Sequence, residues 1–260
     1  MDLGIKGERA LVLGGTQGLT FSAAKFLHEA GVKLAVNGRD AEHGASAVKA
    51  LSADAAFVKG DVSDPTQGPI IHERAVKALG GPVSILITNA GGPPPGQFLE
   101  HDEAAWLKAI ETNMLSALRL AKLVLPEMMA RRWGRIVNVT SFSVREPYPN
   151  LVLSNGARGG LTGAMATIAR EVAPFGVTVN NVLPGLMDTG ALKRVYNQQS
   201  LRQNISVEEV RRRMAESVPM KRLGEADDFG PAVAFLCSRH AGYITAQNVT
   251  VDGGLVRAVM

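Results

Sequence analysis

Two residues near the middle of the chain, Ser154 and Arg158, place a hydroxyl and a permanent cation four positions apart. Residues four apart share one face of a helix, so we expect both side chains to reach one site. A phenol has a pKa of about 10 and an aliphatic hydroxyl a much higher one, so Ser154 is a poor general acid or base. It can still donate a hydrogen bond or position a water. Arg158 can anchor a ligand, but it cannot deprotonate and therefore cannot relay a proton.

Three further polar residues could take part in the same chemistry. Ser141 follows the predicted strand Arg135–Thr140 and could donate a hydrogen bond to a substrate oxygen; the alternative is a serine that only shapes a turn. Asn113 lies beside an apolar helical stripe, so its amide needs a hydrogen-bond partner or a bound water. Alternatively, Asn113 has only a structural role and hydrogen-bonds to the backbone. Tyr148, in a loop between two prolines, is the nearest tyrosine and our preferred substitute proton donor. Alternatively, Tyr148 packs on a subunit or lid surface.

The elements that must position these residues alternate between strand and helix patterns. Strands are expected at Arg9–Leu13, Lys33–Val36, Ala55–Lys59, Ser84–Thr88, Gly134–Thr140, Val177–Leu183 and Asn248–Val251, and helices near 18–30, 40–52, 68–79, 103–130, 155–173 and 226–238. Several strands are continuously apolar, which is typical of parallel strands covered on both faces. The alternation predicts an α/β fold, a Rossmann-type doubly wound parallel sheet of about seven strands with helices on both faces. We expect a single domain over residues 1–260.

A long excursion over 185–222 follows one strand and has a polar helical pattern. Ligands of open α/β sheets bind beyond the carboxyl ends of the strands, so we expect a lid here, with a surface insertion as the alternative. From Lys193 to Arg222 the excursion carries eight basic and three acidic residues, in a chain of net charge +4. Such a run is most often a solvated helix face. Alternatively, the basic run binds an acidic substrate or a cofactor phosphate. Binding of nucleic acid is a third alternative, but no recognition motif in the sequence supports it.

Composition narrows the function classes. The chain has a single cysteine, Cys237, so it cannot form an intrachain disulfide, which is consistent with the reducing cytoplasm. We expect Cys237 to be a small apolar residue buried in the core. No segment has the length of a signal peptide core or of a membrane span, so no membrane partner is expected. The five histidines are scattered without the spacing of metal ligands, and we expect no metal.

A glycine-rich turn, Gly14–Thr20, joins the first predicted strand to the first helix. Glycine permits a tight turn and close approach to a ligand, and the helix N-terminus favours a pyrophosphate. Arg39, after the second strand, suits the 2′-phosphate of NADP(H), because a guanidinium pairs bidentately with phosphate oxygens. The next residue, Asp40, is the kind of acidic residue that would hold the ribose hydroxyls of NAD(H), so NAD(H) stays possible. However, Asp40 also fits the N-cap position of the following helix.

Several motifs occur in an order that resembles the short-chain dehydrogenase/reductase family, over essentially all 260 residues. They are the turn Gly14–Thr20 with Thr20 in place of its last glycine, Asp61-Val62 at the adenine step, Asn89-Ala90-Gly91 after Thr88, Asn113 and Ser141 of the catalytic tetrad, Asn181–Gly185, and Val251–Gly254. The tetrad tyrosine should follow Ser141 by thirteen residues and its lysine four residues later, where this chain has Ser154 and Arg158. The chain is most similar to a divergent branch near the 3-oxoacyl-acyl-carrier-protein reductases.

The resemblance implies the fold, a nicotinamide cofactor and a homotetramer, with a homodimer as the alternative. We expect the catalytic residues to be Asn113, Ser141, Ser154, Arg158 and Tyr148. We expect the cofactor to be held by Gly14, Thr16, Gln17, Gly18, Leu19, Arg39, Asp61, Val62, Asn89, Ala90, Gly91, Arg158, Pro184 and Gly185.

Three functions follow from these residues. The first is an NADP(H)-dependent oxidoreductase acting on a carbonyl or alcohol, with an atypical proton donor and a substrate that is acidic or carrier-linked. The second is a catalytically impaired cofactor-binding protein, either a sensor or a partner subunit. The third is a lyase or isomerase that stabilises an enolate.

Overall fold

Parallel strands form one sheet in the order β3-β2-β1-β4-β5-β6-β7 in a computed structural model that describes residues 2–52 and 54–258. The strands are β1 (Arg9–Val12), β2 (Lys33–Gly38), β3 (Ala56–Lys59), β4 (Ile85–Thr88), β5 (Gly134–Val139), β6 (Val177–Pro184) and β7 (Asn248–Val251). Every residue of β4 and β5 is buried, because helices cover both faces of the sheet. The predicted Rossmann-type α/β fold is confirmed.

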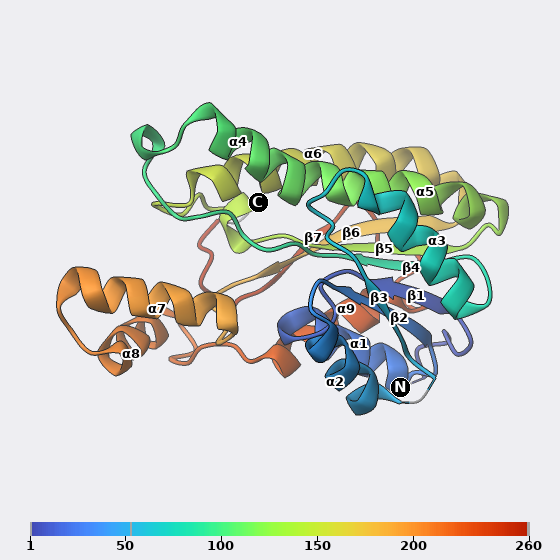
Figure 1. Ribbon diagram of the computed structural model, residues 1–260, viewed down its shortest axis with the longest axis horizontal. Coiled ribbons are helices and arrows are strands. Elements are labelled where there is room, and N and C mark those ends of the chain that lie inside the picture. Colours follow the sequence, from blue (N-terminus) through green and yellow to red (C-terminus); the bar gives the residue numbers. More distant parts are fainter. Residues whose placement is uncertain (1, 53, 259–260) are drawn as a thin grey trace.

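Two helical layers sandwich the sheet (Figure 1). One layer holds α1 (Gly18–Glu29), α2 (Ala41–Leu51) and α9 (Ala226–Cys237), and the other holds α3 (Gln67–Leu79), α4 (Glu103–Ile110), α5 (Ser116–Ala130) and α6 (Val152–Val172). Each layer packs its own cluster of buried aliphatic side chains against the sheet. Cys237 lies in the first cluster with no exposed surface, as predicted, and burial raises the pKa of its thiol to about 12.

The long helix predicted near 103–130 is interrupted. A π-helical turn, Glu111–Leu115, separates α4 from α5, because the Ser116 amide donates to the carbonyl of Glu111 and not to that of Thr112. The helix predicted near 155–173 begins earlier than expected, at Val152, so both Ser154 and Arg158 lie within α6. The other predicted elements have their observed boundaries within two residues.

The excursion after β6 folds into α7 (Gly190–Gln203) and α8 (Val207–Ser217), which project from the sheet in Figure 1. The two helices enclose a small apolar cluster around Tyr196 and Val210. The segment leaves and returns at one place, where Met187 bridges Gly224. Its predicted helical character is confirmed, and its role as a lid stays a prediction.

Half of the basic residues in this segment form ion pairs at the surface. Four arginines form ion pairs with nearby carboxylates: Arg211, Arg212, Arg213 and Arg222. Their side chains are more than half exposed, which agrees with a solvated helix face. Within residues 2–52 and 54–258, no helix is both long and apolar enough to span a bilayer.

Candidate active site

The strand order reverses between β1 and β4, and the loops that leave these two strands meet at the carboxyl edge of the sheet. Such a reversal opens a crevice for ligands. After β1 the chain turns through Gly14 and Gly18, whose φ angles of 59° and 65° suit glycine. After β4 comes Asn89, whose amide nitrogen donates to the Thr20 hydroxyl at 3.3 Å. The structure therefore brings together two motifs far apart in the sequence.

Thr20 supports this turn from inside. Its hydroxyl donates to the carbonyl of Gly14 at 2.6 Å, and its side chain is fully buried. The sequence marked Thr20 only as a missing glycine, and its supporting contact was not predicted. Only the fold places its hydroxyl beside the Gly14 carbonyl. The substitution therefore leaves the turn intact.

The N-terminus of α1 fits a pyrophosphate. Gln17 precedes the helix without a side-chain cap, so the first amides of α1 have no such partner. A Cβ at Gly18 would meet no atom within 4 Å, so the space in front of these amides is open. Free amides and the helix dipole together favour a phosphate group. Thr16 and Leu19 belong to the same turn, as predicted.

Arg39 lies at the end of β2 with 78% of its side chain exposed, 3.9 Å from Asp61. Asp40 is occupied elsewhere, since its carboxylate accepts hydrogen bonds from the amides of Glu42 and His43 at 2.9 Å. These bonds cap α2, and the hydrogen bond from the His43 amide lowers the pKa of Asp40 most, with burial acting against it. The predicted N-cap is confirmed, so the Asp40 carboxylate is engaged by the helix, whereas the Arg39 guanidinium is largely exposed.

Arg158 projects from α6 toward the ends of β4 and β5. Its guanidinium donates to the carbonyl of Val139 at 3.0 Å and to that of Ala90 at 3.3 Å. Only 8% of the residue is exposed, and burial lowers its pKa to about 10. Arg158, Asn89, Ala90 and Asn113 line one small cavity with room for about one water molecule. Four predicted site residues therefore converge from three places in the chain: the loop after β4, the π-helical turn and α6.

Asn113 sits in the middle of the π-helical turn and is 4% exposed. Among the described residues, neither its amide nitrogen nor its amide oxygen has a hydrogen-bond partner. A buried amide without partners is costly, so a ligand or water is expected to satisfy it. This favours a functional role for Asn113 over a merely structural one.

Ser141 follows β5 and is set up as a hydrogen-bond donor. Its hydroxyl oxygen accepts from the amide of Ser143 at 3.2 Å and from the hydroxyl of Ser143 at 2.9 Å. A serine hydroxyl has two acceptor positions and one proton, so the proton of Ser141 is left for another partner. Ser143 is 1% exposed and was not singled out in the sequence. The Ser-x-Ser spacing after the strand was its only signal.

Ser141 and the other two predicted catalytic residues, Ser154 and Tyr148, are not among the residues that line the cavity. Ser154 is 8% exposed, one turn before Arg158 in α6. Tyr148 is 41% exposed, and its ring packs edge-on against Phe142 with ring centroids 5.4 Å apart. The role of Tyr148 as a proton donor stays a prediction.

The remaining predicted cofactor residues border the same edge of the sheet. Asp61 follows β3 and accepts a hydrogen bond from the Ser63 amide at 2.9 Å, with Val62 packing into the core behind it. Pro184 ends β6, and the amide of Gly185 donates to Val251 at 2.9 Å. Gly91 has open space beside it.

A row of polar side chains crosses the sheet from Thr88, the last residue of β4, to Asn248, the first residue of β7. The Thr88 hydroxyl donates to Asn138 at 2.7 Å, Asn138 donates to Asn181 at 3.0 Å, and Asn181 donates to Asn248 at 2.8 Å. This asparagine ladder ties the four strands together within the sheet. It was not predicted from the sequence, because its partners are adjacent only in the sheet.

The matches to known proteins agree with this geometry. The family model described as enoyl-(acyl carrier protein) reductase matches residues 14–256. The 3-oxoacyl-acyl-carrier-protein reductase of Escherichia coli is 33% identical over 97% of this chain and 99% of its own length. The chain belongs to the short-chain dehydrogenase/reductase family.

Other members of the short-chain dehydrogenase/reductase family are equally similar in sequence or close in structure. The 2,3-dihydroxy-2,3-dihydro-p-cumate dehydrogenase of Pseudomonas putida is 33% identical over 97% of this chain and 95% of its own. L-sorbose reductase of Gluconobacter frateurii, complexed with NADPH and L-sorbose, has a TM-score of 0.92 at 25% identity over all of both chains. Actinorhodin polyketide ketoreductase with NADPH has a TM-score of 0.91 at 31% identity, over 95% of this chain and 97% of its own.

The projecting segment of this short-chain dehydrogenase/reductase is fixed at its base by Asp188. Its carboxylate accepts hydrogen bonds from the Tyr196 hydroxyl at 3.1 Å and from Arg211 at 2.8 Å. Burial alone would raise the pKa of Asp188, but the hydrogen bonds from Arg211 and Tyr196 outweigh it and hold the pKa below its ordinary value. The carboxylate therefore stabilises the packing of α7 and α8 only while it is ionised.

We expect α7 and α8 to loosen as the pH falls below about 3.9, the pKa of an unfolded aspartate. A carboxyl with a lowered folded pKa stabilises fully above its unfolded pKa and loses that effect as the pH falls through the folded one. Glu209 on α8 keeps its charge longer, because hydrogen bonds from Arg212 and Arg213 lower its pKa to about 2. The rate of pepsin cleavage within residues 190–217, normalised to the rate for an unstructured peptide, should rise as the pH falls below about 3.9. Asp188→Asn should already be cleaved faster at pH of about 5; equal cleavage of both proteins throughout would contradict the role of Asp188.

Proposed function

We propose that this protein is an NADP(H)-dependent oxidoreductase that reduces a carbonyl or oxidises an alcohol with an atypical proton donor. The observation that carries the proposal is one cavity, lined by the buried Arg158 guanidinium and the unpartnered Asn113 amide, at the edge where β1 and β4 end. The membership of the family supports an oxidoreductase. The expected substrate is a small carbonyl or alcohol, with an acidic or carrier-linked group, since the Escherichia coli relative is named for an acyl-carrier-protein substrate.

Nicotinamide chemistry fits the residues present. When bound, the nicotinamide would supply or accept a hydride, which needs mainly correct orientation from the protein. The turn Gly14–Leu19 would hold the pyrophosphate, and Arg39 would hold the 2′-phosphate. The two NADPH-bound relatives support NADP(H), with NAD(H) as the alternative.

At the substrate end, the free proton of Ser141 would stabilise an oxyanion by hydrogen bonding. Arg158 would keep the site positive and hold the cofactor ribose, without relaying a proton. Ser154 is a poor acid, so the proton must come from another group, and Tyr148 or a water positioned by Ser154 are the proposed sources. The lid over 185–222, a homotetramer or homodimer and a cytoplasmic location complete the proposal.

Arg39 should decide the choice of cofactor. We expect NADPH to bind tighter than NADH, and Arg39→Ala to weaken NADPH binding about 10- to 100-fold, because a charge-assisted hydrogen-bond pair to phosphate is lost. NADH binding should change little. Titration of both proteins with both cofactors, followed by nicotinamide fluorescence, measures this.

Lys59→Ala is a matched control, because Lys59 is an exposed cation at the end of the neighbouring strand β3. It should leave NADPH affinity nearly unchanged. Equal losses for the two variants would show a general effect of charge and remove Arg39 from the 2′-phosphate site. Failure of both cofactors to bind would overturn the proposed function.

The second candidate is a cofactor-binding protein without turnover, favoured by the poor acidity of Ser154. The two candidates separate in one assay of NADPH oxidation over a panel of ketones, aldehydes and acyl thioesters. Turnover supports the oxidoreductase. Tight NADPH binding with no oxidation on any member of the panel supports the second candidate.

A further inference from the structure

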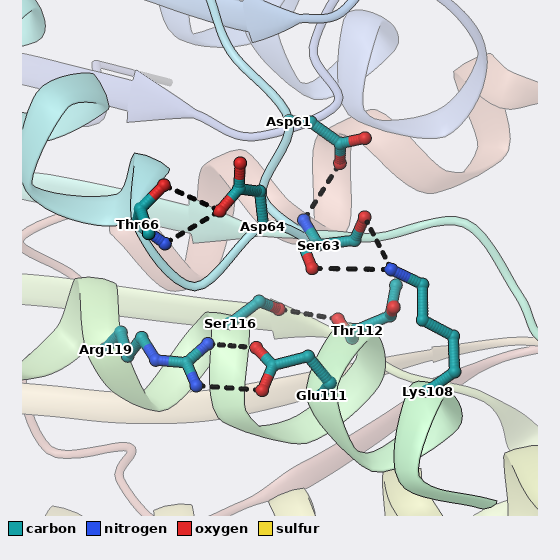
Figure 2. A network of polar contacts seen from close by, with 9 residues as sticks. All are labelled: Asp61, Ser63, Asp64, Thr66, Lys108, Glu111, Thr112, Ser116 and Arg119. Atoms are coloured by element: carbon teal, nitrogen blue, oxygen red, sulfur yellow. Dashed lines mark hydrogen bonds and ion pairs between the residues drawn. The ribbon is translucent and has the colours of Figure 1, made fainter. Parts of the chain in front are cut away.

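The π-helical turn between α4 and α5 has two unusual hydrogen bonds, and Figure 2 shows the one that the Ser116 hydroxyl donates. The amide of Ser116 reaches back five residues to the carbonyl of Glu111. The carbonyl of Thr112, which would accept that amide in an α-helix, instead accepts the Ser116 hydroxyl at 2.6 Å. Ser116 is 4% exposed, so this bond is protected from solvent. The Ser116 amide thus makes the π-helical hydrogen bond, and the Ser116 hydroxyl satisfies the Thr112 carbonyl that this bond leaves without a backbone donor.

An ion pair spans the same turn. The Arg119 guanidinium meets the Glu111 carboxylate with two hydrogen bonds, one of them 2.9 Å long. In an α-helix successive residues are roughly 100° apart, so residues eight apart point roughly 80° away from each other and residues seven apart only roughly 20°. A π-helical turn inserts one extra residue. It therefore brings Glu111 and Arg119, eight positions apart, into the alignment that a seven-residue spacing would otherwise have.

The pair is well placed to hold this register. The Glu111 and Arg119 side chains are 23% and 31% exposed, so solvent screens them less than a fully exposed pair. The hydrogen bond from Arg119 lowers the pKa of Glu111, and the same bond raises the pKa of Arg119. The pair is therefore ionised across the neutral pH range. Loss of the π turn would pull the two groups out of line and break both hydrogen bonds.

We propose that Glu111, Ser116 and Arg119 form a π-turn clamp that positions Asn113. Asn113 is the third residue of the turn, and its unpartnered amide lines the cavity beside Arg158. An α-helical register would rotate Asn113 by roughly the 100° of one residue relative to one of its flanking helices, away from its present position. The three clamp members are positioning residues, since none of them carries the chemistry. Only the activity readout below rests on the proposed function.

The first test measures the turn itself and needs no substrate. Amide hydrogen exchange of the full chain should become about ten-fold faster in peptides covering residues 111–116 for Arg119→Met, as loss of about 1.4 kcal/mol of local stability implies. The matched control is Arg131→Met, which breaks a 3.2 Å pair with Glu8 at the end of α5. It should leave residues 111–116 unchanged. The charge swap Glu111→Arg with Arg119→Glu should restore slow exchange. Unchanged exchange in Arg119→Met would overturn the clamp.

The second test asks whether the clamp acts through Asn113. Arg119→Met should lower kcat about ten-fold and leave NADPH affinity nearly unchanged. In a protein that already carries Asn113→Ala, the same substitution should cost nothing further, because two residues acting through one group are not additive. Additive losses would show that Arg119 acts elsewhere and would overturn the positioning role. A wild type that binds NADPH without turnover would instead contradict the proposed function, and the exchange measurement would still decide the clamp.

Discussion

Replacing Ser141 by alanine is expected to lower kcat by about 10²- to 10³-fold, the effect of removing one oxyanion donor. Two hydrogen bonds from Ser143 occupy the acceptor positions of the Ser141 hydroxyl, so its proton is available for donation to a substrate oxygen. NADPH affinity should change little, because the serine lies after β5 and not in the turn that holds the pyrophosphate. Steady-state turnover on the best substrate of the panel, with a fluorescence titration of NADPH, separates the two effects.

Ser143→Ala provides the graded companion to this experiment. It removes the hydroxyl donor to Ser141 but keeps the backbone one, so we expect a smaller loss in kcat of about five- to ten-fold, the value of one hydrogen bond. A Ser141→Ala protein should lose nothing more when Ser143 is also replaced. Full turnover in Ser141→Ala would remove the serine from the proposed chemistry and leave Asn113, Ser154 and Tyr148 as the polar candidates.

Phe229→Ala is expected to destabilise the protein by about 3–5 kcal/mol, the usual cost of a large cavity in a closed core. Phe229 lies on α9 with no exposed surface, in the cluster between the sheet and α1. The cavity left by Phe229 cannot collapse easily, because α1 and α9 are already in close contact. A Cβ added at Gly230 on α9 would come within 2.4 Å of the Ser22 hydroxyl on α1. Urea unfolding followed by circular dichroism measures the free energy of unfolding.

Phe235→Ala is the control on the same helix. Phe235 is 39% exposed, so its removal should cost much less, about 1 kcal/mol or below. Similar midpoints for the two variants would mean that α9 does not form the closed core described here. Both proteins should retain their affinity for NADPH at low temperature, since neither side chain reaches the glycine turn.

The regular elements could be predicted because their signals are local. Continuous apolar runs marked β4 and β5, and the strand–helix alternation correctly predicted a parallel sheet with helices on both faces. The π-helical turn could not be predicted in this way, since periodicity describes Glu111–Leu115 as ordinary helix. Its register depends on where the Ser116 hydroxyl and the Arg119 guanidinium find partners. These hydrogen bonds depend on which side chains meet in the fold, and they do not change the hydrophobic periodicity of the sequence.

The candidate site was predictable to the extent that its residues belong to motifs. Asn89, Asn113 and Arg158 were expected to converge, and they line one cavity. Thr20 and Ser143 were not expected to matter, because their importance comes from hydrogen bonds to neighbours that only the fold provides. The charge of the basic run was visible, but its pairing with Asp188, Glu209, Glu216 and Asp228 was not.

The asparagine ladder has a direction across the sheet. Starting from the Thr88 hydroxyl, Asn138 and Asn181 each accept a hydrogen bond from the strand on one side and donate one to the strand on the other, and Asn248 accepts the last of these bonds. Reversing one amide would set oxygen against oxygen or nitrogen against nitrogen at its neighbours, so the three amides can change orientation only as a set. The orientation of the Asn248 amide in β7 is therefore coupled to that of the Thr88 hydroxyl, which lies three strands away and directly before the loop that carries Asn89.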